Sequence, residues 1–196
     1  VTMTFPLDDT PARHVRDVLG LFATGVTVVT SMSNGEPVGM TCQSFSSVSL
    51  NPPLVLFCVA KTTRMARLIE TAPGFAINLL TADQEAVSRQ FAGSNKDDAA
   101  RSVTLVRGPV APLIDGSLAA LSCTTAAIHA GGDHWIVVGR VVALHDTHMQ
   151  PDAAPLVAAG GGGGRGGVWG MILYLALLHV AGWQVSRSGT PTCNLK

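Results

Sequence analysis

The sequence has few charged residues and no excess of either sign. Only 13% of its 196 residues are charged, and 13 basic side chains balance 13 acidic ones. Without a positive field or a cluster of Lys and Arg, we expect no binding to nucleic acid or to an anionic membrane. Apolar residues make up 47% of the chain. This balance indicates that a partner covers part of the apolar surface, most simply a second copy in a homodimer.

Several common site motifs are also missing. The four cysteines, Cys42, Cys58, Cys123 and Cys193, are far apart and form no CxxC pair, which argues against a metal site or a redox dithiol. Unpaired thiols are typical of the cytoplasm, and residues 1–6 lack the basic start and apolar core of a signal peptide. No GxGxxG follows a strand pattern and no P-loop is present, so a Rossmann site or an NTPase is not supported.

Strand patterns outnumber helix patterns. Short β-branched or apolar runs predict strands at 26–31, 54–59 and 75–80, and longer strands are expected at 117–130 and 135–145. The run at 54–59 is expected to be buried on both faces. Tight hairpins are predicted at Asn34-Gly35 and at Gly131-Gly132, which places Asp133 and His134 at a hairpin tip. We therefore predict a mainly β protein with a few helices, an antiparallel barrel instead of a parallel α/β sheet.

Three helices are expected. Apolar residues at helical spacing after Thr10-Pro11 predict a first helix with one buried face, which carries Val15, Val18, Leu19 and Phe22. A second helix is expected to be capped by Thr62 or Thr63. A capping box at 81–84 opens the third.

A hydroxyl-rich stretch at 39–49 is the centre of the functional interpretation. Its Ser and Thr side chains either form an exposed polar edge strand or surround a polar ligand, such as a phosphate or the rim of a flavin. Lys61 and Arg64 flank the start of the second helix, where they are either solvated or bind phosphate. Asn78 lies within an apolar strand, so its amide either ties down a loop or faces a ligand. Taken alone, the loop residue His134 is more often a surface side chain than a catalyst.

Five segments, in the same order, resemble the short-chain flavin reductases, the small components of two-component monooxygenases. The resemblance covers roughly residues 14–157, and the segments read FATGVTVVT at 22–30, GMTCQSF at 39–45, SLNPPL at 49–54, FAINLL at 75–80 and GGDHWIVVGRV at 131–141. The resemblance implies an FMN-binding split β-barrel of Greek-key type, a homodimer with flavin near the subunit interface. It implies NAD(P)H-dependent reduction of FMN or FAD, with the reduced flavin diffusing to a separate monooxygenase.

The resemblance also assigns residues. The flavin would be lined by Thr41, Gln43, Ser44, Phe45 and Ser46, with Ser47 on its phosphate side, Lys61 and Arg64 at the phosphate, and Asn78 on a flavin-facing strand. His134 falls where the family places a histidine near the nicotinamide, so we treat it as the catalytic-site residue. Two alternatives remain open: a flavin- or haem-binding barrel without turnover, and an enzyme of the pyridoxamine-phosphate oxidase type, which needs a richer basic phosphate site.

The resemblance ends after Val157. We therefore predict a flavin reductase-like domain over 1–157 and a divergent tail over 158–196. The tail begins with a glycine run at 160–164 and continues with an apolar segment at 168–183. The run is expected to act as a linker, and the apolar segment, which is too short to span a membrane, is expected to form a short helix that packs on the barrel or its dimer partner. The tail is expected to be dispensable for the flavin site.

Overall fold

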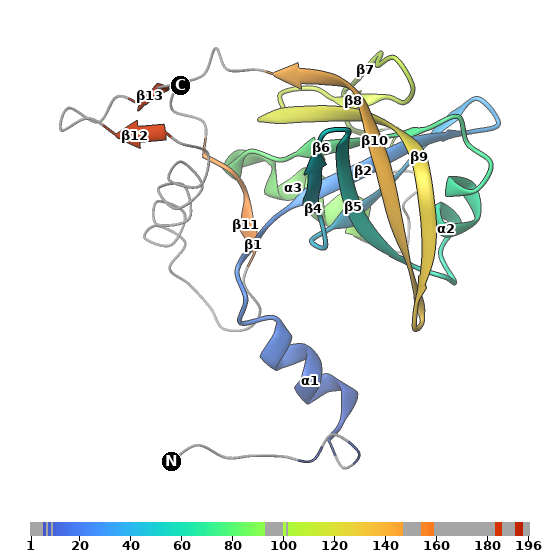
Figure 1. The fold of residues 1–196 in the computed structure, drawn as a ribbon, viewed down its shortest axis with the longest axis vertical. Coiled ribbons are helices and arrows are strands. Elements are labelled where there is room, and N and C mark those ends of the chain that lie inside the picture. Colours follow the sequence, from blue (N-terminus) through green and yellow to red (C-terminus); the bar gives the residue numbers. More distant parts are fainter. Residues whose placement is uncertain are drawn as a thin grey trace. The chain divides into compact units, whose positions relative to one another are not determined.

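A single antiparallel sheet dominates the structure (Figure 1). The computed structural model describes residues 6, 8, 10–92, 100, 102–146, 154–158, 183–185 and 191–193. The chain divides into two compact units, Val1–Gly160 and Gly161–Lys196. The sheet belongs to the first unit, and β12 (Trp183–Val185) pairs with β13 (Pro191–Cys193) in the second.

Seven strands form the sheet in the order β3-β2-β6-β9-β10-β5-β4, and all of its pairs are antiparallel. Their bounds are β2 (Thr27–Ser33), β3 (Glu36–Cys42), β4 (Ser46–Leu50), β5 (Pro53–Ala60), β6 (Phe75–Leu79), β9 (Ala119–Gly131) and β10 (His134–Asp146). Two short pairs accompany it: β1 (Thr24–Gly25) with β11 (Val157–Ala158), and β7 (Leu105–Val106) with β8 (Leu113–Ile114). The prediction of a mainly β, antiparallel fold is confirmed.

The connection from β3 to β4 shows that the sheet is strongly curved. These strands are its two edges, yet only residues 43–45 separate them in the chain. Four Cα–Cα steps reach at most about 15 Å, whereas the edges of a flat seven-stranded sheet would lie about 29 Å apart. The sheet must therefore curl until its edges approach each other. No ladder joins β3 to β4 within the described residues, so the curl leaves a split.

The inside of this curl is the main core. It draws buried side chains from almost every strand and from α2 (Arg64–Ile69), among them Val29, Met40, Phe57, Met65 and Phe75. The rings of Phe57 and Phe75 meet edge to face with centroids 5.1 Å apart. A second core on the other side of β2 contains Val28 and Phe91 of α3 (Glu85–Ala92). Gly39 of β3 allows the Phe91 ring to pack close to the sheet, because a Cβ on Gly39 would collide with that ring.

The helices begin close to the predicted positions. Thr63 caps α2, since its hydroxyl accepts a hydrogen bond from the Ala66 N–H at 3.2 Å. The capping box at Thr81 and Gln84 is present and opens the 3₁₀ turn η2 (Ala82–Gln84), which leads into α3. Helix α1 (Ala12–Leu19) begins directly after Thr10-Pro11, as predicted; its N-cap is Pro11, and no side chain caps it.

Burial differs from expectation in two elements. The face of α1 predicted to be buried is largely exposed: Val15 is half-buried, Val18 and Leu19 are exposed, and Phe22 after the helix is 78% exposed. Strand β5 is buried on one face only, because the residues between Val55, Phe57 and Val59 are half-buried. Both errors have the same origin. An apolar pattern predicts which side chains should be buried but not what buries them, and within one copy of the described chain nothing buries these surfaces.

The predicted hairpins are confirmed. Asn34 and Gly35 both have positive φ, as the tight turn between β2 and β3 requires. The hairpin between β9 and β10 is also present, but its turn consists of Gly132 and Asp133, one residue later than predicted, and His134 is the first residue of β10 and not part of the tip. The linker at 160–164 and the helix expected within 168–183 fall outside the described residues, except that Trp183 begins β12. Within the described residues no helix is long and apolar enough to cross a membrane, and Cys42, Cys58 and Cys123 are free thiols.

Candidate functional site

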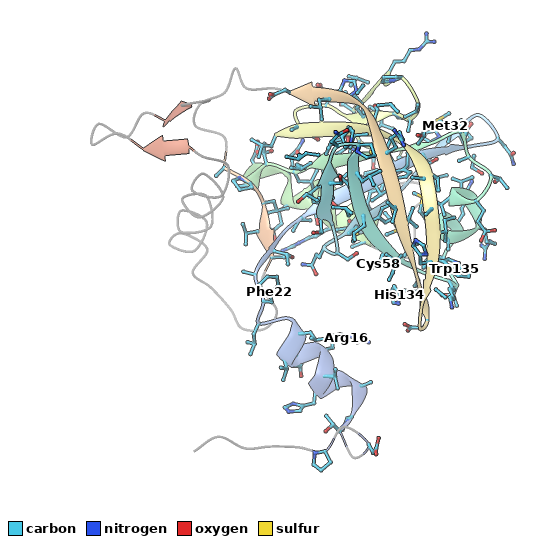
Figure 2. All side chains as sticks on the ribbon, in the orientation of Figure 1. Arg16, Phe22, Met32, Cys58, His134 and Trp135 are labelled. Atoms are coloured by element: carbon cyan, nitrogen blue, oxygen red, sulfur yellow. The ribbon has the colours of Figure 1, made fainter. Side chains whose placement is uncertain are left out.

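The C-terminal end of β5 brings two separate predicted regions together. On one side, Ser44 of the β3–β4 linker contacts Cys58. On the other side, the tip of the β9–β10 hairpin lies alongside, with His134 opposite Ala60 in the ladder. Figure 2 shows Cys58, His134 and Trp135 gathered towards this end of the sheet. Residues 90 positions apart in the chain thus meet around one strand end.

Ser44 acts as a substitute backbone partner at the split of the sheet. Pairing of β4 with β5 ends at Leu56, and beyond it the Cys58 N–H donates to Ser44 Oγ at 2.8 Å. Ser44 Oγ also lies 3.3 Å from the Cys58 carbonyl and 3.1 Å from Cys42 Sγ. The hydroxyl therefore anchors the linker, and the linker's position is fixed before any ligand binds. Burial raises the pKa of the Cys42 thiol, so Cys42 is a neutral neighbour.

The other residues of the hydroxyl-rich stretch divide into two groups. Gln43, Ser46 and Ser47 have exposed side chains beside the split, and the Ser46 hydroxyl donates to the Ser47 carbonyl at 3.2 Å. Phe45 packs against the main core. Thr41 instead donates to the Ser88 carbonyl of α3 at 2.6 Å, which fixes the end of β3.

The two predicted phosphate cations differ in their surroundings. Lys61 directly follows β5, and its ammonium donates to the Gly132 carbonyl at 2.6 Å while lying 4.5 Å from the centroid of the Trp135 ring. Arg64 is exposed at the first position of α2. An ammonium has three donors, so the contact with Gly132 leaves Lys61 able to bind an anion as well.

His134 is partly exposed and has an acidic neighbour. Its Nδ1 lies 2.7 Å from Asp133 Oδ1, and its side chain is 43% exposed. The hydrogen bond with His134 lowers the pKa of the Asp133 carboxyl, with a smaller contribution from the charge of Lys61. Asp133 is therefore an ionised acceptor that orients the imidazole, and Nε2 is left as the ring nitrogen that can face a ligand.

Asn78 lies away from these residues. It has no exposed surface, and its amide donates to the Val28 carbonyl at 3.0 Å and to Thr30 Oγ1 at 3.1 Å. Its oxygen accepts the Ile114 N–H at 2.9 Å. The structure therefore shows the loop-tying alternative, and in this arrangement Asn78 offers no surface that a flavin could contact.

One residue at this end of the sheet was missed by the sequence reasoning. Trp135 covers the Lys61 ammonium, but the two are 74 positions apart in the chain. Only the register of β10 against β5, with Trp135 opposite Val59, makes them neighbours. Strand alternation alone places Trp135 on the face opposite to His134 and says nothing about its partner.

The donor set fits a phosphorylated aromatic cofactor better than a metal ion. Exposed hydroxyls, a carboxamide and two cations suit polar ring edges and phosphate oxygens. The described residues hold no group of three or more His, Cys, Asp or Glu side chains able to bind a metal. These groups lie together at one end of the curved antiparallel sheet.

Comparison with known proteins identifies the family. The family model described as "Flavin reductase like domain" matches residues 19–165. The chain therefore belongs to the flavin reductase-like family.

Characterised relatives are similar over most of their length. The reductase subunit HsaB of a flavin-dependent monooxygenase from Rhodococcus jostii is 43% identical over 139 residues, which are 70% of this chain and 71% of the relative. The FMN reductase (NADH) SmoA from Agrobacterium fabrum is 43% identical over 156 residues, 79% of this chain and 86% of the relative. Among solved structures, the NADH:FAD oxidoreductase SgcE6 from Streptomyces globisporus, in complex with NAD and FAD fragments, has a TM-score of 0.75 at 38% identity and covers 85% of this chain and 98% of its own.

Proposed function

We propose that this protein uses NADH or NADPH to reduce FMN or FAD and supplies the reduced flavin to a separate monooxygenase. The observation that carries the proposal is the meeting of the β3–β4 linker, Lys61 and His134 around the end of β5. Relatives named as NADH-dependent flavin reductases and as reductase subunits of monooxygenases support it.

The flavin is proposed to lie along the split. Gln43, Ser46 and Ser47 offer it side-chain donors and acceptors, and Phe45 supplies an apolar wall. Thr41 and Ser44 act indirectly, because their hydroxyls hold the ends of the linker in place. Lys61 and Arg64 are proposed to bind the flavin phosphate through charge-assisted hydrogen bonds.

The residues of the chain need only orient and desolvate the reacting rings. When bound, the flavin supplies the hydride-accepting chemistry. The site must hold the nicotinamide within about 3–3.5 Å of it, and donors are needed where negative charge develops. We assign His134 to the nicotinamide side, with Asp133 fixing its imidazole. Solvent can supply the remaining proton, which agrees with the partial exposure of His134.

We further propose that the working form is a homodimer with a split-barrel fold. Exposed apolar side chains occur on β4 and β10, where Leu50 is 92% and Leu144 is 73% exposed, and β5 runs between these strands with half-buried Leu54 and Leu56. A second copy with the same apolar edge would bury these side chains and would also cover the exposed face of α1. The low charge of the chain supports the same arrangement.

A flavin-binding barrel without turnover is the alternative, and one assay separates the two. Purified protein is mixed with NADH or NADPH, and nucleotide oxidation is followed at 340 nm with FMN, FAD or riboflavin added in turn, under air. The proposal expects oxidation that depends on flavin. Folded protein that binds flavin yet oxidises neither nucleotide would support the binding module instead.

A further inference from the structure

The ammonium of Lys61 is bound to the hairpin that carries His134. Its Nζ donates to the Gly132 carbonyl at 2.6 Å, and its backbone N–H donates to the Asp133 carbonyl at 3.0 Å. The same ammonium lies 4.5 Å from the centroid of the Trp135 ring. Lys61 thus contacts Gly132 and Asp133, which precede His134, and Trp135, which follows it.

The register of the sheet explains why these groups meet. His134 pairs with Ala60, so Lys61 is the first residue beyond the ladder and lies opposite the turn. Trp135 pairs with Val59, and because side chains alternate, Lys61 and Trp135 point to the same face as Val59. Trp135 is half-buried and packs on the main core, so its ring is a fixed surface for the cation.

We propose that Lys61 and Trp135 form a latch that positions His134 for the nicotinamide, so that Trp135 is a positioning residue for hydride transfer. This inference rests on the proposed function. The turn residues Gly132 and Asp133 are exposed, and Asp133 directs His134 through their 2.7 Å contact. The backbone of His134 is held by its ladder partners Ala60 and Gly131, and the Lys61 ammonium adds a side-chain tie from β5 to the exposed turn that carries Asp133.

The latch and the phosphate role of Lys61 can be separated with riboflavin, which lacks phosphate. If Lys61 only binds phosphate, its loss should matter with FMN and not with riboflavin. If Lys61 holds the hairpin, its loss should raise the KM for NADH with either flavin. Lys61→Met removes the charge while keeping a long side chain, whereas Lys61→Arg retains a cation that can stack on Trp135.

The experiment measures the KM for NADH with riboflavin as acceptor. We expect Lys61→Met and Trp135→Leu each to raise it about three- to tenfold, since each removes a cation–ring contact and Lys61→Met also removes a charged donor. Lys61→Arg and Trp135→Phe should stay within about twofold of wild type, because a cation over a ring is retained. Arg67→Met is the matched control: Arg67 is an exposed cation of α2 whose guanidinium donates to the Thr62 carbonyl at 3.5 Å, and its replacement should leave the KM for NADH unchanged.

Two further measurements test whether the latch acts through His134. In a His134→Ala background, Trp135→Leu should raise the KM no further, because its effect depends on the imidazole. Hydrogen exchange of the peptide covering residues 131–136 should be faster in Lys61→Met than in wild type, with the melting temperature used to confirm that the variant is folded.

The outcomes are distinct. A wild-type protein that oxidises neither NADH nor NADPH with any flavin overturns the proposed function and, with it, the role of the latch in nicotinamide binding. If the wild type is active, any of three results overturns the latch alone. These are a rise in the KM for NADH in Lys61→Met with FMN but not with riboflavin, a full effect of Trp135→Leu on that KM in the His134→Ala background, and unchanged hydrogen exchange at residues 131–136 in Lys61→Met.

Discussion

Replacing Asn78 by Ala tests whether this amide cross-links the fold or serves the flavin. The side chain has no exposed surface and makes three hydrogen bonds, to the Val28 carbonyl, Thr30 Oγ1 and the Ile114 N–H. Ala leaves the Ile114 N–H without this acceptor, which costs about 1–3 kcal/mol, and each of the other two lost bonds adds about 0.5–1.5 kcal/mol. The sum is about 2–6 kcal/mol, a large part of the roughly 5–15 kcal/mol that stabilises a typical domain.

The assay is thermal unfolding followed by circular dichroism, with flavin titrations on the protein that stays folded. In a domain of 150–250 residues, each kcal/mol shifts the melting temperature by about 2–4 °C, so Asn78→Ala should melt at least about 4 °C below wild type. Gln90→Ala, which removes an exposed amide on α3, should remain within about 0.5 kcal/mol of wild type. An Asn78→Ala variant that has the melting temperature of wild type but binds flavin more weakly would refute the reasoning and would support a flavin-binding role for Asn78.

Four other predictions concern the phosphate, the dimer, the tail and the thiols. Arg64→Ala should weaken FMN binding about tenfold, since a charged hydrogen bond contributes about 1.5–3 kcal/mol, and leave riboflavin binding unchanged; equal loss in both titrations would exclude a phosphate contact. Leu50→Lys should shift the protein towards monomer in sedimentation velocity while Val106→Lys should not, because only Leu50 lies on the proposed interface; identical profiles would remove β4 from that interface. A chain that ends at Gly160, the boundary of the first unit, should still bind flavin but be a weaker dimer, and loss of flavin from a folded, dimeric truncated chain would place the tail in the site. Burial raises the pKa of Cys123 to about 12, so about one thiol in ten thousand is ionised at pH 8, and peptide mapping after iodoacetamide treatment should find Cys123 modified more slowly than half-buried Cys58.

Much of the fold could be predicted because local patterns determine it. The Asn34-Gly35 turn, the Thr63 cap and the box at Thr81 each depend on residues within four positions of one another. The same locality explains the errors. Exposure of α1 depends on what lies against it, and apolar spacing carries no information about whether that surface is another part of the chain or a second copy.

The site was predictable in composition but not in the role of each hydroxyl. Ser44, Ser46 and Ser47 look equivalent in the sequence. Only Ser44 lies beyond the point where the pairing of β4 with β5 ends, and its hydroxyl accepts a hydrogen bond from the Cys58 N–H. Thr41 is fixed by α3, an element that follows it by more than 40 residues. Contacts of this kind depend on register and on long-range packing, which a single sequence does not specify.

The three-residue connection between the two edge strands also affects how the protein avoids aggregation. An open sheet presents unpaired N–H and C=O groups at both edges, and another chain can add a strand there. In this fold β3 and β4 are those edges, and the curl brings the end of β3 against β5, with Cys42 Sγ 3.9 Å from the Cys58 carbonyl. At that end no room is left for a foreign strand, and the Cys58 amide is already bonded to Ser44. The stretch assigned to cofactor binding thus also shields the sheet from edge-to-edge association between partly folded chains.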